Sequence, residues 1–210
     1  MKLRVAVLAS FVVLVGSTTA TAAFTEPSPP VRVSRDADTR LDLPAGEHQA
    51  EPHVAVDPTN PLHLVATAHE GRFFDGGAQS IGAYVSWDGG RTWSNQLLPD
   101  LTVKTGGVWE RATDPVAGFA ADGTAYINSF AFNRTTGDET AFVVHRSDDG
   151  GVTWEPARSL YDPGQNDQTI ANQIVVLPDG TLVDLFAEFH NENAQKLRGW
   201  SVRLIRSTDK

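Results

Sequence analysis

Short apolar segments alternate with polar turns along the chain from His53 onward. The segments are rich in β-branched and aromatic residues and are bounded by Gly, Pro, Asn or Asp. They show no 3.6-residue helical period, and this combination is typical of β-strands. We therefore expect strands, joined by tight turns, at 53–56, 62–68, 81–85, 116–120, 124–130, 142–146, 173–177, 181–186 and 200–206.

An eight-residue motif recurs between these segments. The sequence Ser-Trp-Asp-Gly-Gly-Arg-Thr-Trp at 86–93 returns as Ser-Asp-Asp-Gly-Gly-Val-Thr-Trp at 147–154, and Ser-Thr-Asp at 207–209 begins it again. A fixed period of about 60 residues indicates a repeat architecture. The motif residues are Ser86, Asp88, Gly90, Thr92 and Trp93, then Ser147, Asp149, Gly151, Thr153 and Trp154, and finally Ser207 and Asp209.

The chemistry of a tight hairpin explains the composition of this octet. Asp88 and Asp149 can accept backbone N–H bonds within the turn, the Gly pair supplies positive φ, and the final Trp packs between sheets. The same turn serves every repeat alike, whereas an active site is singular. We therefore expect these aspartates to be structural rather than catalytic or metal-binding.

The repeat also predicts the architecture. In each period three predicted strands lead to the octet, and a fourth leaves from its Trp. Four short antiparallel strands per unit describe a blade of a β-propeller, so we expect an all-β fold with blades at about 47–98, 99–160 and 161–210. Propellers close with roughly four to eight blades, and this chain holds two whole blades and part of a third. We expect further C-terminal blades, and a partial ring completed by self-assembly is the alternative.

The first residues are typical of an export signal. A basic start at Lys2 and Arg4 precedes the apolar run 5–15, and small residues lead to Ala22, where we expect cleavage. The run is too short to span a bilayer, and a buried N-terminal helix is the alternative. Residues 23–46 are rich in Pro and charge and are predicted to form a leader. No later segment is apolar enough for an anchor, so we expect a secreted or periplasmic protein.

Composition narrows the classes of partner. The 17 basic and 26 acidic side chains give a net charge of −9, which argues against nucleic acid or an anionic membrane as the main partner. The absence of Cys excludes disulfides, thiolate zinc sites and a cysteine nucleophile. No His shares a clear ligand spacing with a carboxylate, so we expect neither a metal nor another cofactor. The triplet at 133–135 matches a glycosylation sequon.

The octet Ser-x-Asp-Gly-Gly-x-Thr-Trp resembles the Asp-box, or bacterial neuraminidase repeat, of the sialidase-like β-propellers, and the resemblance covers about residues 47 to 210. It implies an exported glycoside hydrolase of the exo-α-sialidase type, acting on terminal sialic acid or a related anionic sugar. This chain would be an inactive N-terminal part of such an enzyme. Asp-boxes also occur in non-catalytic propellers. A propeller that binds glycan or protein in the cell envelope is therefore the alternative, and whether the protein is an enzyme stays open.

The resemblance also implies site residues. Sialidases carry Arg-Ile-Pro before the first strand, where this chain has Ala50-Glu51-Pro52 and so lacks that arginine. They carry Glu-x-Arg after the second strand, which matches 70–72 here. By this resemblance Arg72 would contact the substrate carboxylate and Asp75 would be the general acid. The remaining arginines, the Tyr nucleophile and its Glu would come from later blades, and a solvated polar loop is the alternative for Arg72 and Asp75.

The longer polar loops are expected at the end of the blades opposite to the octets, where function usually concentrates. They are predicted at 47–52, 69–80, 109–115, 133–139, 162–172 and 188–196. The further candidate substrate-binding residues in these loops are Glu51, Glu70, Glu110, Arg111, Asp114, Asp167, Glu188 and His190.

Overall fold

The computed structural model describes residues 29–34, 49–135, 139–164, 166–193 and 196–207. The chain divides into two compact units, 1–30 and 31–210, and the account below concerns the second unit. The predicted export signal lies outside the described residues, as do Asp209 and most of the predicted leader. No helix in the described part of the chain is long and apolar enough to cross a membrane.

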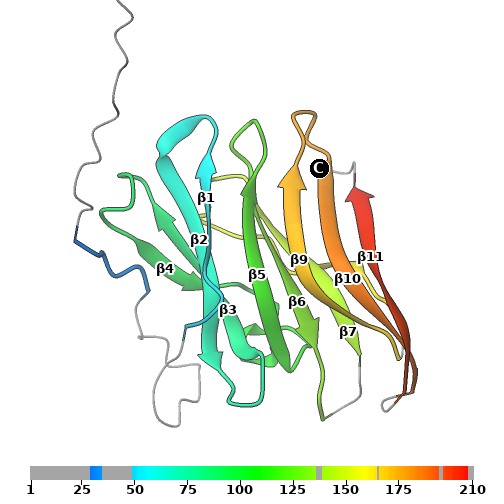
Figure 1. Ribbon diagram of the computed structural model, residues 1–210. Helices are drawn as coiled ribbons and strands as arrows, with labels where there is room; N and C mark the ends of the chain where they lie inside the picture. The colour runs from blue at the N-terminus through cyan, green and yellow to red at the C-terminus, as the bar shows by residue number, and fades with distance from the viewer. Residues whose placement is uncertain (1–28, 35–48, 136–138, 165, 194–195, 208–210) are drawn as a thin grey trace, which may run out of the picture. The chain divides into compact units, whose positions relative to one another are not determined.

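The described part of the second unit is built from β-strands and one short 3₁₀ turn, η1 (Val103–Thr105) (Figure 1). The strands are β1 (His53–Asp57), β2 (Asn60–Arg72), β3 (Ala78–Ser86), β4 (Ser94–Leu97), β5 (Arg111–Phe119), β6 (Ala125–Phe132), β7 (Thr140–Ser147), β8 (Arg158–Tyr161), β9 (Gln168–Val176), β10 (Leu182–Asn193) and β11 (Lys196–Ser207).

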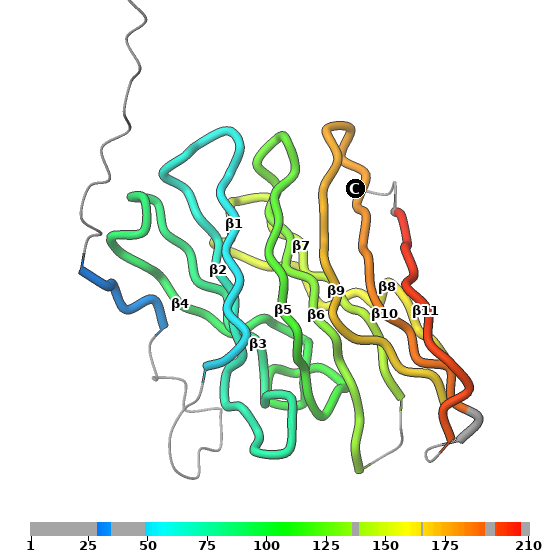
Figure 2. The backbone as a smooth tube through the Cα atoms, in the orientation of Figure 1, coloured from blue at the N-terminus to red at the C-terminus, as the bar shows by residue number. Residues whose placement is uncertain are grey.

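The strands form consecutive antiparallel blades in chain order. Strands β1 to β4 make blade 1, β5 to β8 make blade 2, and β9 to β11 form the three-stranded sheet that we call blade 3. One backbone pair, Ala78 with Ala112, joins blades 1 and 2. Figure 2 traces the first strands of the blades side by side, and β5 contacts both β1 and β9. The predicted all-β fold of propeller blades is confirmed.

The hydrophobic core lies between blades rather than within one sheet. Every residue of β3 is buried, because its two faces are both covered. Ile81 of β3 belongs to a buried cluster with Ile127 and Val143 of blade 2. On the other side of blade 2, Phe142 meets Phe186 of blade 3 with ring centroids 4.6 Å apart. Apolar burial at about 25 cal/mol per Å² therefore stabilises the stacking of successive blades.

The two octets fold into equivalent turns. In the first, the Ser86 hydroxyl donates to Asp88 Oδ1 at 2.9 Å and accepts the N–H of Gly90 at 2.8 Å. Asp88 also accepts the N–H and the hydroxyl of Thr92, at 2.9 and 2.7 Å. These bonds, led by that of the Thr92 backbone, lower the pKa of Asp88 to about 2. Both carboxylate oxygens of Asp88 therefore accept hydrogen bonds within their own turn, which is typical of a structural residue.

The second octet repeats this geometry. Thr153 donates its N–H to Asp149 Oδ1 at 2.8 Å and its hydroxyl to Oδ2 at 2.7 Å. Ser147 donates to Asp149 at 2.8 Å and accepts the N–H of Gly151 at 2.7 Å. Trp154, which ends the octet, is buried in the cluster between blades 1 and 2. Ser207, the first residue of the third octet, ends β11.

A histidine links the octets of blades 1 and 2. The buried ring of His63 stacks on Trp87 with centroids 3.7 Å apart and planes 2° from parallel. Its Nδ1 lies 2.9 Å from Asp57 Oδ2, and its Nε2 lies 2.8 Å from the carbonyl oxygen of Gly150. The ring thus joins the first turn of blade 1 to the octets of both blades. His63 and His145 are both fully buried.

Several strands are longer than predicted, and the larger extensions run toward the end opposite to the octets. Residues assigned to loops lie in strands instead: Glu70 and Arg72 in β2, Arg111 and Asp114 in β5, and Glu188 and His190 in β10. Polar and charged side chains made these stretches resemble loops. Backbone pairing continues because the neighbouring strand is equally long, as in the pairs Arg72–Ala78 and Arg111–Phe132.

Candidate functional site

The candidate residues gather at one end of the blades. This end holds the β2–β3 connection at 73–77, the starts of β1, β5 and β9, and the ends of β6 and β10. We call it the loop face, and the octets lie at the opposite ends of the strands. Among the residues that the structure describes, three clusters of polar side chains occur here: one around Asp75, one around Glu51, and one around His190.

Asp75 is bound by arginine. Arg111 Nη1, from the start of β5, lies 2.6 Å from Asp75 Oδ1 and 2.7 Å from the carbonyl oxygen of Gly76. The guanidinium of Arg111 also lies over the ring of Phe73, 4.0 Å from its centroid. The hydrogen bond from Arg111 lowers the pKa of Asp75. A general acid needs a proton at working pH, so Asp75 is not poised as an acid while Arg111 holds it.

A second arginine approaches the same carboxylate. Arg134 Nη2 lies 3.7 Å from Asp75 Oδ2, and its Nη1 donates to the carbonyl oxygen of Asp75 at 3.3 Å. Glu110 holds the loop that carries this arginine, because its Oε2 accepts the backbone N–H groups of Arg134 and Thr135 at 2.7 and 2.8 Å. Glu110 is therefore a support for the loop. Arg134 was noted in the sequence only as part of a sequon, although it lies in a predicted loop.

Arg72 and Glu70 differ in their surroundings. Arg72 ends β2, is exposed, and forms no ion pair with any carboxylate in the described ranges. Glu70 is almost fully buried. Its carboxylate accepts one hydrogen bond from the Tyr84 hydroxyl and another from Gln49 Nε2 at 3.0 Å. A substrate on the loop face could reach Arg72 but not Glu70. Arg72 ends β2, and Asp75 lies three residues later in the β2–β3 connection.

The second cluster joins the first strands of the blades. Glu51 Oε2 accepts the backbone N–H of Asp114 at 2.9 Å and lies 2.8 Å from Nε2 of the buried His69. Asp114 Oδ2 in turn accepts the N–H of Ala171 at 3.0 Å. Burial raises the pKa of Asp114, and the nearby Glu51 carboxylate raises it further against the opposing bond from Ala171. Carboxylates of blades 1 and 2 therefore form a chain across the starts of the three blades.

His69 is a neutral member of this cluster. Burial lowers the pKa of His69 to about 4, so at neutral pH its ring donates one N–H and carries one lone pair. Its Nε2 also lies 3.0 Å from Thr113 Oγ1. Neither His69 nor Thr113 was a predicted site residue. The signal for His69 was its position directly before Glu70, at the end of a predicted strand.

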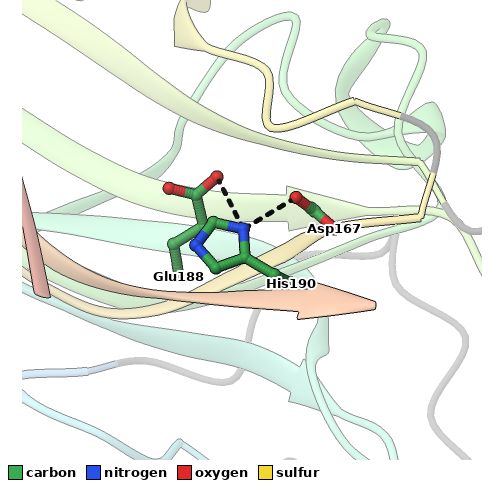
Figure 3. Close-up of side chains that lie close together, drawn as sticks. All are labelled: Asp167, Glu188 and His190. Atoms are coloured by element: carbon green, nitrogen blue, oxygen red, sulfur yellow. Dashed lines mark hydrogen bonds and ion pairs between the residues drawn. The ribbon is translucent and has the colours of Figure 1, made fainter. Parts of the chain in front are cut away.

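The third cluster lies at the loop face of blade 3 (Figure 3). His190 Nδ1 is 3.0 Å from Asp167 Oδ2 and 3.8 Å from Glu188 Oε1. The bond from His190 lowers the pKa of Asp167. Glu188 is buried, pairs with Arg203 Nε at 2.6 Å, and accepts the Tyr161 hydroxyl at 3.0 Å. The structure thus brings together three residues that the sequence analysis named separately, and adds Tyr161 and Arg203, which it missed.

Comparison with known proteins supports the fold. No protein-family model matches the chain, and no curated protein matches it in sequence. The Hadza microbial sialidase Hz136 is similar in structure with a TM-score of 0.56 and 21% sequence identity, over 77% of this chain and 35% of that one. The GH93 α-L-arabinofuranosidase of Fusarium graminearum has a TM-score of 0.53 and 16% identity, over 81% and 52%.

A protein of unknown function from Dyadobacter fermentans is similar to the same degree, with a TM-score of 0.53 and 17% identity over 80% of this chain and 54% of that one. At these identities the likeness establishes a propeller fold that glycosidases also use. The chain spans between 35% and 54% of the length of these three structures.

Proposed function

We propose that this chain is the N-terminal part of an exported glycoside hydrolase of the sialidase type, which takes the terminal anionic sugar of a glycan at the loop face. The observation that carries the proposal is the convergence of Arg111 and Arg134 on the carboxylate of Asp75. Stacking on Phe73 and the bond to Gly76 hold Arg111 in place. A fixed guanidinium binds a carboxylate with little loss of side-chain freedom.

A sugar carboxylate would compete with Asp75 for these arginines. Once displaced, Asp75 would lose the contact that lowers its pKa, and its pKa would rise toward that of a general acid. Arg72, exposed and free of carboxylate partners among the described residues, offers a further guanidinium. The same residues could therefore bind the substrate and then protonate the leaving oxygen. The sialidase and the arabinofuranosidase with a similar fold support the wider glycosidase class.

A second candidate is a propeller that binds an anionic glycan without hydrolysing it. Two observations favour it: Ala50 stands where the resemblance expects an arginine, and Asp75 is held as a carboxylate by Arg111. Both candidates use the same arginines. They differ in whether Asp75 ever carries a transferable proton.

Binding and hydrolysis separate the two candidates. We expect N-acetylneuraminic acid to bind this chain in an NMR titration, and Arg111→Ala to weaken binding at least tenfold. Arg158→Ala, an exposed arginine on β8, serves as the matched control. On the full-length protein, Asp75→Asn should lower release of 4-methylumbelliferone from its sialoside by about 100-fold or more. Binding without turnover would favour the second candidate. Absence of both, or binding that ignores Arg111→Ala, would refute this use of the loop face.

A further inference from the structure

We propose that Asp167, Glu188 and His190 bind a divalent transition-metal cation at the loop face of blade 3. This site is independent of the sugar position proposed above and departs from the sequence-based expectation of no metal. Glu188 and His190 are alternate residues of β10, so their side chains leave the same face of the strand. Asp167 directly precedes β9. Figure 3 shows the three side chains turned toward one another.

The spacing of the three donor atoms suits a metal ion. His190 Nδ1 lies 3.0 Å from Asp167 Oδ2 and 3.8 Å from Glu188 Oε1, and all three ligand atoms lie within 4.8 Å of one another. Zinc bonds of about 2.1 Å in a tetrahedral arrangement separate ligand atoms by about 3.4 Å. The observed distances bracket this value, so small side-chain rotations bring all three atoms to bonding distance of one cation.

The orientation of His190 points to a positive charge in this space. Its Nε2 lies 3.2 Å from the Ser201 hydroxyl on β11, which leaves Nδ1 facing the two carboxylates. The ligand oxygens of Asp167 and Glu188 lie within 4.8 Å of each other, and a cation between them would offset the repulsion of the two carboxylates. Histidines that ligate metals commonly bond their other ring nitrogen to a second partner. Ser201 fills that position here.

Other bonds hold the carboxylates in place. Asp167 Oδ1 accepts the backbone N–H of Asn191 at 2.8 Å, which leaves Oδ2 directed at His190. Glu188 is only 3% exposed. Buried charged carboxylates in proteins are normally paired with a cationic group or bound to a metal. Its Oε2 pairs with Arg203 at 2.6 Å. Asp167, Glu188 and Arg203 together leave one negative charge for an incoming cation.

The donor set selects the metal. One imidazole nitrogen with two carboxylate oxygens suits Zn²⁺ or Mn²⁺, whereas Ca²⁺ and Mg²⁺ favour oxygen donors alone. The side chains of Asp167 and His190 are 25% and 31% exposed, so a cation can enter from solvent. Water or another ligand would complete its coordination.

Isothermal titration of the chain with ZnCl₂, after removal of bound metal with EDTA, tests the proposal. We expect one Zn²⁺ per chain, and a loss of affinity of at least about tenfold in both His190→Gln and Asp167→Asn. His53→Gln, which changes a histidine of β1 outside the cluster, should bind as the unaltered chain does. Absence of one-to-one binding, or binding that both cluster variants retain, would show a proton-bridged ion pair instead of a metal site.

A second measurement uses the unaltered chain, so it tests the proposal even if a cluster variant fails to fold. In the unaltered chain, Zn²⁺ should shift the ¹⁵N resonance of His190 Nδ1 while the His53 resonances stay in place. Unchanged His190 resonances at saturating Zn²⁺ would overturn the proposal without any substitution.

Discussion

The carboxylate of Glu51 accepts the backbone N–H of Asp114, 63 residues later in the chain, at 2.9 Å. One blade further on, Asp114 binds the N–H of Ala171 in the same way. All three residues have positive φ, at 54°, 50° and 59°. Such a backbone costs roughly 1 kcal/mol or more for a residue with a side chain. The blade-to-blade bonds offset this strain and set the spacing between the starts of the blades.

Removing the charge of Glu51 should change the titration of its neighbour. In Glu51→Gln the pKa of Asp114 should fall, because the like charge that raises it is gone, yet it should stay above its usual value since burial is the larger cause. Titration of the ¹³C carboxyl resonance of Asp114 measures this. Glu155→Gln, which alters a carboxylate paired with Arg146 away from the loop face, is the control. An unchanged Asp114 titration would mean that the two groups are not coupled in solution.

Asp184 should make stability fall as pH rises toward neutral. Burial raises the pKa of Asp184 to about 7, and Asn128 Nδ2 donates to its Oδ2 at 2.7 Å. The folded chain therefore holds a proton that the unfolded chain releases at lower pH. Stability from this group is complete below about pH 4 and is lost by about pH 7, at about 1.4 kcal/mol per pKa unit.

The variant Asp184→Asn should remove this loss and raise the free energy of unfolding by up to about 4 kcal/mol at pH 8 relative to its effect at pH 4. Urea denaturation at both pH values measures it. Asp179→Asn is the contrasting case, because the Thr181 N–H lowers the pKa of Asp179 and its contribution is lost as pH falls. Equal effects of Asp184→Asn at the two pH values would contradict the assignment.

Glycines at the same position of the two octets should differ in their tolerance of a methyl group. Gly89 and Gly150 have φ of 73° and 72°, so alanine costs roughly 1 kcal/mol at either. A Cβ at Gly150 would lie 2.6 Å from Trp87 and 2.7 Å from His63, whereas at Gly89 the nearest atom is 3.2 Å away on Leu62. Overpacking adds about 1 to 3 kcal/mol, so Gly150→Ala should be the more destabilising.

Denaturant titration of the two alanine variants under identical conditions measures the difference. The comparison isolates packing, because the turn conformation is common to both sites. If Gly89→Ala and Gly150→Ala lose the same stability, the stack of His63 on Trp87 does not constrain the second octet.

Much of the propeller could be predicted because its signals are local. Ser86, Asp88 and Thr92 complete the first turn through bonds that span no more than four residues. The repeat then shows where each blade begins again. Strand ends were less accurate at Glu70, Arg111 and His190, because polar side chains there resemble a loop while the backbone pairing depends on a neighbouring strand.

The clusters of the loop face could be predicted only as residue types. Arg111 was a named candidate, but its contact with Asp75 spans 36 residues. Asp167 and His190 were also named, yet their contact across 23 residues depends on the register between β9 and β10. Tyr161 and Arg203 were missed because nothing adjacent to them in the chain marks a partner.

The amino-acid sequence by itself determined the repeated four-stranded module and the turn that ends its third strand, since both depend on residues close together in the chain. Only the tertiary structure decided which charged side chains meet: Arg111 with Asp75, Glu51 with Asp114, and His190 with Asp167 and Glu188. Those distances follow from how strands and blades pack against one another. That packing is determined jointly by many apolar contacts between the blades, and no short segment of the sequence encodes it.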